Sequence, residues 1–177
     1  AGFPWTTFQW DLLLVEVLLA STLFVVPGRI DRFDPRIEPS VAGRWVLWLV
    51  LFRLMFRSGF AKLASGDPTW ADLGALDYHY FTQPLPTVLG WYAAHLPGWW
   101  NAISCALMFG VELVLPFFIF IPARWARRTA AAGFAALMLS IALTGSYGFF
   151  NLLTLVLALT LVDDDAWRRL IPTGWLG

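Results

Sequence analysis

Long apolar runs separated by short polar segments constrain this chain more than any other feature of its sequence. A helix that crosses a membrane needs roughly 20 apolar residues. The last run, over residues 129–162, would make a helix of about 50 Å, too long for a hydrocarbon core of about 30 Å. Because the turn-forming stretch at residues 144–148 lies in its middle, we predict a break there. The predicted spans are residues 10–27, 44–64, 101–122, 129–143 and 149–162.

These spans predict an all-α fold, a polytopic transmembrane helix bundle in one domain, and the composition agrees. Hydrophobic residues make up 59% of the 177 residues and charged residues only 14%, which leaves too little polar surface for a soluble globule. The 12 basic and 12 acidic residues give no basic excess for binding nucleic acid. The lone Cys105 excludes an internal disulfide and a cysteine-based zinc site. Tryptophans flank the apolar runs, as in the aromatic belts of membrane proteins.

The charges between the runs predict a single orientation. Segments 28–44 and 123–128 are rich in arginine, whereas the Trp- and Pro-rich loop at residues 65–100 has no lysine or arginine. By the positive-inside rule, the first two segments are cytoplasmic and the long loop is extracytoplasmic. The break at 144–148 then also lies outside. A connection as long as the 65–100 loop is usually functional or carries its own structure.

Four ionisable residues fall inside the apolar runs, where a charge is costly and points to function by default. They are Glu16, Arg53, Arg57 and Glu112. From their depths along the spans, we predict two ion pairs, Arg53 with Glu112 and Arg57 with Glu16. These pairs either lock the helix packing or line a polar cavity that opens outward.

Lys62 lies where the second span meets the outer surface. It is either an interfacial lysine with its head in water or a reactive base, because a partly desolvated lysine can lose its proton. His79 and His95 lack a carboxylate at a ligand-like spacing, so no metal site is predicted. The sequence contains no nucleophile elbow and no phosphate-binding glycine loop.

The segment at residues 77–86 is dense in hydrogen-bonding side chains, and we expect it to meet the break at 144–148. A turn below the membrane surface needs protein partners for its backbone, since lipid offers none. Lys62 and His79 are the candidate catalytic residues of the resulting pocket, unless the loop simply plugs the bundle. The polar pocket is predicted to contain Tyr78, His79, Tyr80, Thr82, Gln83, Tyr147 and Asn151.

Several motifs resemble those of one known family. They are FQWDLLLVE (8–16), GFAKL (59–63), DYHYFTQPLP (77–86), ELVLPFF (112–118) and GSYGFFNLLT (145–154). Over nearly its whole length the chain resembles the membrane domain of lipase maturation factors. This implies a multispanning protein that helps lipases reach an active form, in the endoplasmic reticulum in animals. The family's soluble C-terminal domain, thought to bind clients, is not here, so we expect a fragment or a short relative.

A second resemblance concerns Lys62 alone. Gly59-x-x-Lys62-Leu63, followed by Asp67 and Trp70, is similar to a segment of vitamin K-dependent gamma-carboxylases, where the corresponding lysine is taken as a base. Arg57 departs from that pattern, and Trp70 lies further from the lysine, so only a reactive Lys62 is implied and not the carboxylase activity.

Three functions therefore stay open. The first is a maturation factor that assists a client protein, and the second is an accessory subunit of a larger membrane complex. The third is a membrane enzyme that uses Lys62 on a lipid-soluble substrate such as a quinone. The expected partners are membrane lipids with a client protein or neighbouring subunits, and no cofactor is predicted beyond a lipid or quinone. The residue usage favours a bacterial cytoplasmic membrane, or the endoplasmic reticulum in a eukaryote.

Overall fold

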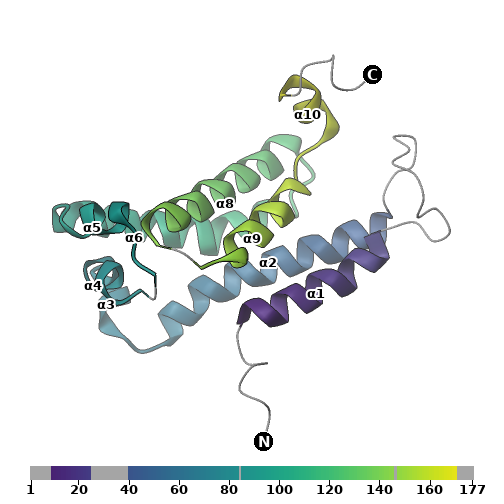
Figure 1. The fold of residues 1–177 in the computed structure, drawn as a ribbon. Helices are drawn as coiled ribbons and strands as arrows, with labels where there is room; N and C mark the ends of the chain where they lie inside the picture. The colour runs from purple at the N-terminus through teal and green to yellow at the C-terminus, as the bar shows by residue number, and fades with distance from the viewer. Residues whose placement is uncertain (1–8, 25–39, 84, 146, 171–177) are drawn as a thin grey trace, which may run out of the picture.

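The computed structural model describes residues 9–24, 40–83, 85–145 and 147–170, and this part of the chain contains helices and no named strands (Figure 1). The all-α prediction is confirmed. The long helices are α1 (Gln9–Phe24), α2 (Val41–Ala64), α6 (Gly98–Phe109), α8 (Arg124–Thr144) and α9 (Phe149–Leu159). The short ones are α3 (Pro68–Ala71), α4 (Ala75–Thr82), α5 (Val88–Ala94), α7 (Leu115–Phe118) and α10 (Asp164–Leu170). A π turn at Gly110–Val114 joins α6 to α7.

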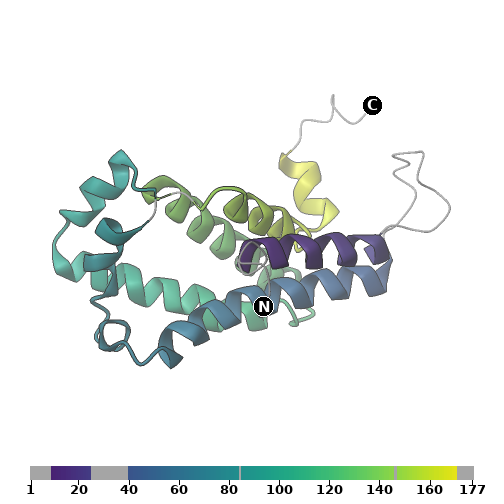
Figure 2. The ribbon, with the colours of Figure 1, turned by 60° about the horizontal axis from the view of Figure 1, so that its bottom comes forward.

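The helices form an elongated bundle. Helix α1 packs along α2, α8 packs along α9, and α2 also contacts the π turn, α7 and α9. Helices α3, α4 and α5 gather at one end of the bundle, whereas α10 lies at the other end (Figures 1 and 2). We call α3, α4 and α5 together the cap.

The core lies where α2, α7, α8 and α9 meet. Fully buried large side chains come from all four helices, and buried alanines on α8 let its neighbours approach closely. The indole Nε1 of Trp48 on α2 donates to the carbonyl oxygen of Thr160 after α9, at 3.2 Å. The largest fully buried side chains of the core are Phe134, Leu51, Met55, Ile119 and Leu157.

The structure supports two of the predicted spans by length and composition. Among the described residues, the continuous helix Gly98–Phe118 and helix α8 are each 21 residues long and apolar enough to cross a membrane. Helix α2 is longer, but it carries Arg44, Arg53, Arg57 and Lys62. Helix α9 is apolar, but it has only 11 residues.

Several predicted boundaries were wrong. Residues 124–128 were predicted as part of a cytoplasmic loop, but they form the first turns of α8, because arginine is a good helix former. Helix α2 begins at Val41 rather than 44, since the Ser40 side chain accepts a hydrogen bond from the Gly43 N–H at its start. Helix α9 ends at Leu159 rather than 162. Residues 25–39, part of the predicted first helix and first loop, lie outside the described residues.

The segment predicted as an extracytoplasmic loop carries its own structure, since it contains the whole cap and the start of α6. Among the described residues, three side-chain hydrogen bonds attach the cap and the turn between α4 and α5 to the bundle. The Asn101 amide of α6 donates to the Asp77 carboxylate at 2.7 Å. At the end of α8, the Gln83 amide donates to the Thr144 carbonyl and the Thr87 hydroxyl to the Leu143 carbonyl, both at 2.6 Å.

The predicted contact between segment 77–86 and the break at 144–148 is confirmed. Pro86 and Gly145 form an isolated antiparallel bridge beside the two hydrogen bonds from Gln83 and Thr87. The last carbonyl groups of a helix have no partner within the helix. The cap supplies partners for those of α8, which explains why a polar segment sits against this helix end.

Gly90 allows this close approach. A Cβ atom added at Gly90 would lie 2.1 Å from the Thr144 carbonyl oxygen, a backbone atom that cannot rotate away. We therefore expect Gly90→Ala to lower the free energy of unfolding by about 1–3 kcal/mol, the usual cost of overpacking. Thermal unfolding of the purified protein in detergent measures the change. Gly98→Ala is the matched control, since a Cβ there meets nothing within 4 Å; equal stability of the two variants would contradict this packing.

Candidate functional site

A cavity of about 760 Å³ lies between α2, α4, α6, the π turn, α8 and α9. Pockets that hold small molecules commonly measure about 300–1,000 Å³ and are mostly apolar with a few polar groups. This cavity follows that description, because leucine, methionine and aromatic side chains make most of its wall. Its polar side chains are Ser58, Lys62, His79, Tyr80, Ser104, Glu112, Ser140, Thr144, Tyr147 and Asn151.

Lys62 and Glu112 form the main polar contact of the cavity wall. The Lys62 Nζ donates to both carboxylate oxygens of Glu112, at 2.6 and 2.8 Å. It also donates to the Ser58 hydroxyl at 2.9 Å, and that hydroxyl donates to Glu112 Oε1 at 3.1 Å. The Glu112 side chain is only 5% exposed and that of Lys62 21%. The three groups thus form a closed triangle in which the two charges neutralise each other.

Two local features of the chain place Glu112 against α2. Pro116 has no N–H for the usual bond to the Glu112 carbonyl four residues earlier, and its ring crowds that carbonyl. The helix widens into the π turn over these residues, and such turns often occur at functional sites. On the facing helix, a Cβ at Gly59 would lie 2.8–3.0 Å from Leu113 and Glu112. Glycine at 59 therefore brings Ser58 and Lys62 within reach of the carboxylate.

Both predicted ion pairs were wrong. The Arg53 guanidinium pairs with Glu16 on α1, and Glu112 pairs with Lys62. Arg57 is exposed and forms no ion pair with any described residue. The reason is the face of α2 that each residue occupies. Arg53 and Arg57 lie roughly opposite the buried face that carries Met55 and packs against the bundle, so neither can reach Glu112.

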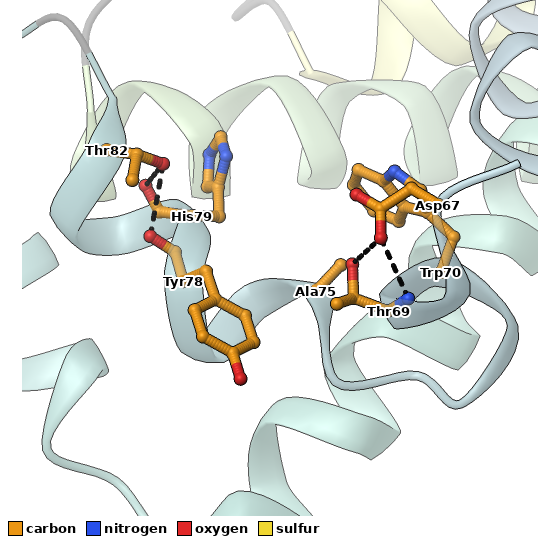
Figure 3. A pocket seen from close by; sticks show the side chains of 7 residues that line it. All are labelled: Asp67, Thr69, Trp70, Ala75, Tyr78, His79 and Thr82. Carbon is orange, nitrogen blue, oxygen red and sulfur yellow. Dashed lines mark hydrogen bonds between the residues drawn. The ribbon is translucent and has the colours of Figure 1, made fainter. Parts of the chain in front are cut away.

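The predicted polar pocket is divided between two neighbouring cavities. Lys62, His79, Tyr80, Tyr147 and Asn151 line the large one. Tyr78 and Thr82, together with His79, line a smaller cavity of about 250 Å³ between α3 and α4 (Figure 3). Gln83 lines neither of these two cavities, because its buried amide bonds to the Thr144 carbonyl.

Figure 3 shows the smaller cavity, with Trp70 and His79 on opposite sides of it. These two side chains also line the large cavity, so the two spaces share part of their wall. The Asp67 carboxylate accepts bonds from the backbone N–H and the hydroxyl of Thr69, at 2.9 and 2.8 Å, which fixes the turn that carries Trp70. The Trp70 ring in turn lies 5.7 Å from the Lys62 Nζ, within range of a cation–π contact.

Burial shifts the titration of three side chains that line the large cavity toward their neutral forms. Desolvation, helped by the nearby Lys62 charge, lowers the pKa of His79 below its usual value, so the ring is neutral at pH 7. Desolvation also raises the pKa of Tyr80 and of Tyr147, which keeps both hydroxyl groups protonated. No group of three or more histidine, cysteine or acidic side chains within the described residues is arranged to hold a metal ion.

The sequence reasoning missed Ser58, Trp70, Trp100 and Ser104, which also line the large cavity. Ser58 precedes Lys62 by four residues and therefore shares its helix face. That spacing was the available signal. Trp70 was marked only by the resemblance to gamma-carboxylases, and nothing in the sequence marked Trp100 and Ser104, because their position depends on how α6 packs.

The contact between Lys62, Ser58 and Glu112 predicts that removing one of its two charges destabilises the protein more than removing both. Lys62→Met leaves the buried Glu112 carboxylate without its cation, and we expect it to lower the free energy of unfolding by about 3–5 kcal/mol. The double variant Lys62→Met/Glu112→Leu removes both charges and should recover most of that loss. Unfolding in detergent, read by circular dichroism, measures both. Arg57→Met is the control, since it removes an exposed cation from the same helix. A double variant no more stable than Lys62→Met would contradict the assignment.

Comparisons with known proteins agree with one another. A protein-family model described as the lipase maturation factor transmembrane domain matches residues 1–169. "Lipase maturation factor 2" of Mus musculus is 44% identical, over 95% of this chain and 26% of that protein. "Lipase maturation factor 2" of Homo sapiens is 40% identical, over 89% of this chain and 24% of that protein. "Lipase maturation factor 1" of Homo sapiens is 29% identical, over 98% of this chain and 30% of that protein. The chain thus spans about a quarter of the length of the curated relatives it matches, and no solved structure matches it.

Proposed function

Because the chain belongs to the lipase maturation factor transmembrane domain family, we propose that it is the membrane-embedded part of a protein that assists the maturation of a lipase client. The family match over residues 1–169 carries this proposal, and it confirms the resemblance indicated by the sequence motifs. Relatives named as lipase maturation factors are about four times as long as this chain. In this proposal the domain is a framework that holds the protein in the membrane. The activity toward the client depends on this domain together with the rest of the protein.

The proposed topology has five spans, formed by α1, α2, the helix Gly98–Phe118, α8 and α9, with the cap on the extracytoplasmic side. The charges at the end opposite the cap support it. At the end opposite the cap, Arg128 bonds to Asp163 at 2.6 Å, and this hydrogen bond lowers the pKa of Asp163 below its usual value. Arg124 lies in the same cluster, so the positive charge is at the proposed cytoplasmic end. The membrane in question is the bacterial cytoplasmic membrane or, in a eukaryote, the endoplasmic reticulum.

The outer surface of the cap is the proposed contact region for the client. Large apolar side chains here are more than half exposed, although single exposed apolar residues are ordinary on protein surfaces. A dense group of them on one surface marks an interaction site or a membrane interface. The exposed residues of the cap and the turn between α4 and α5 include Tyr78, Phe81, Leu85, Val88, Leu89, Trp91 and Tyr92.

A second function, an accessory subunit of a larger membrane complex, is favoured by one observation. The Arg53–Glu16 pair lies on the outer face of α1 and α2, with the side chains 52% and 37% exposed. A charged pair facing lipid is costly, so a neighbouring protein segment is the better surrounding for this face. Purification in a mild detergent distinguishes the two functions. A stoichiometric complex with other membrane proteins supports the subunit, and a protein that copurifies only with a lipase client supports the maturation factor.

The maturation role predicts that the full-length protein raises the specific activity of a secreted homodimeric lipase. The host cells would lack their own maturation factors, and the readout is lipase activity divided by lipase mass in the medium. Lys62→Arg keeps the cation for Glu112 but cannot act as a base, because arginine does not lose its proton in proteins. We expect this variant to keep its activity within about twofold.

Two other results would contradict these expectations. If wild-type protein leaves the lipase specific activity at the level of empty vector, the maturation role is wrong. If the Lys62→Arg variant is folded but inactive, the role as a membrane framework is wrong, and the protein is instead an enzyme that uses Lys62 as a base. Leu152→Ala, a change on the exposed face of α9, controls for the effect of mutation on expression.

A further inference from the structure

The Asn151 side chain has an unsatisfied hydrogen-bonding group in the wall of the large cavity. Asn151 is only 5% exposed, and its Oδ1 has no hydrogen-bond partner in the described part of the chain. A buried polar atom without a partner costs about 1–3 kcal/mol. Asn151 is one of the residues that line the large cavity, so its side-chain amide lies beside the space open to a ligand. A hydroxyl group suits this position, because it can donate to the oxygen of an amide or accept from its nitrogen.

The cavity wall presents no net charge to a ligand. The Lys62 ammonium is already bonded to both oxygens of the Glu112 carboxylate, so neither charge is left for a phosphate, a carboxylate or an amine. His79 is the other titratable base on the wall, and its ring is neutral at pH 7. Displacing either partner of the ion pair would leave a buried charge uncompensated, which is strongly unfavourable. An uncharged ligand fits this wall.

The cavity opens sideways between α6 and α8. Leu107 of α6 lines the cavity and is 66% exposed, and Trp100 of the same helix is also exposed. Across from them, Ala136 and Ser140 of α8 line the cavity and are exposed too. These are the two helices whose length and composition suit a membrane span. The mouth is therefore mainly apolar and faces the hydrocarbon region, from which a lipid can enter without crossing water.

We propose that the large cavity binds one molecule of an uncharged lipid with long hydrocarbon chains and a free hydroxyl group, of the diacylglycerol type. The chains lie against the apolar wall formed by α6 and α8, and the hydroxyl bonds to Asn151. Lys62 and Glu112 stay paired and keep charged lipids out. The inference depends only on the cavity, so it holds whether or not the protein acts on a lipase.

Photo-crosslinking tests this site without any client. A diacylglycerol with a diazirine in one acyl chain is added to the purified full-length protein in detergent, irradiated, and the labelled peptides are identified by mass spectrometry. We expect labels on the cavity-facing parts of α6 and α8, and competition by unlabelled diacylglycerol. Triacylglycerol lacks the hydroxyl and phosphatidic acid carries a charge, so each should compete about three- to tenfold more weakly.

Two variants make the test specific. Asn151→Leu removes the amide at nearly constant volume, and we expect half-maximal labelling to need about three- to tenfold more probe. Leu152→Ala, on the exposed face of the same helix, should label like the wild type. Ala136→Phe fills the mouth from the exposed side of α8 and should abolish labelling of the cavity.

Three results would overturn the proposal. Labelling confined to surfaces outside the cavity would show that no lipid enters it. If triacylglycerol competed as strongly as diacylglycerol, the hydroxyl would have no role in binding. If phosphatidic acid did so, the neutral wall would not exclude charged lipids. A folded Asn151→Leu protein with unchanged labelling would remove Asn151 from the site. None of these results depends on the lipase assay, so the lipid site and the maturation role can fail separately.

Discussion

The buried contact between Lys62 and Glu112 determines how the two sides of this bundle can be arranged. Removing two charges from water costs several kcal/mol for each, and only close, fully bonded geometry compensates for it. That geometry requires Gly59 on α2 and the widened turn before Pro116 on the facing helix. The contact therefore fixes the distance between α2 and the π turn at the cap end. Because its two charges neutralise each other, this wall of the cavity carries no net charge.

The helical class could be predicted from the sequence because apolar runs of this length have few other ways to satisfy their backbone in a membrane. The ion pairs could not be predicted from depth alone. Depth along a span says how far a residue lies from the surface, but it does not say which way the side chain points. Arg53 and Glu112 had matching depths, yet Arg53 lies on the outer face of α2 and reaches Glu16. The face of each arginine relative to Met55 was available in the sequence and would have excluded that pair.

The contact between the long loop and the break before α9 was predictable for a different reason. The end of a helix leaves carbonyl groups without partners, and the polar segment 77–86 was the nearest source of donors. What the sequence could not give was the space that remains beneath the cap. A cavity depends on the fit of side chains from α2, α4, α6, α8 and α9, which approach one another only after folding. Position 90 requires glycine because the Thr144 carbonyl, 54 positions later in the chain, lies against it. The sequence does not show that these two residues meet.

Helix α4 connects the two surfaces on which the proposed functions depend. His79 and Tyr80 face the large cavity, while Tyr78 and Phe81 on the same two turns are exposed on the cap. The helix is fixed at both ends, by the bond from Asn101 to Asp77 and by the bond from Gln83 to the end of α8. A cap held in this way cannot shift without leaving the Thr144 carbonyl and the Asp77 carboxylate without these partners. The arrangement therefore favours a rigid cap, so that a lipid in the cavity supports the shape of the exposed surface from beneath.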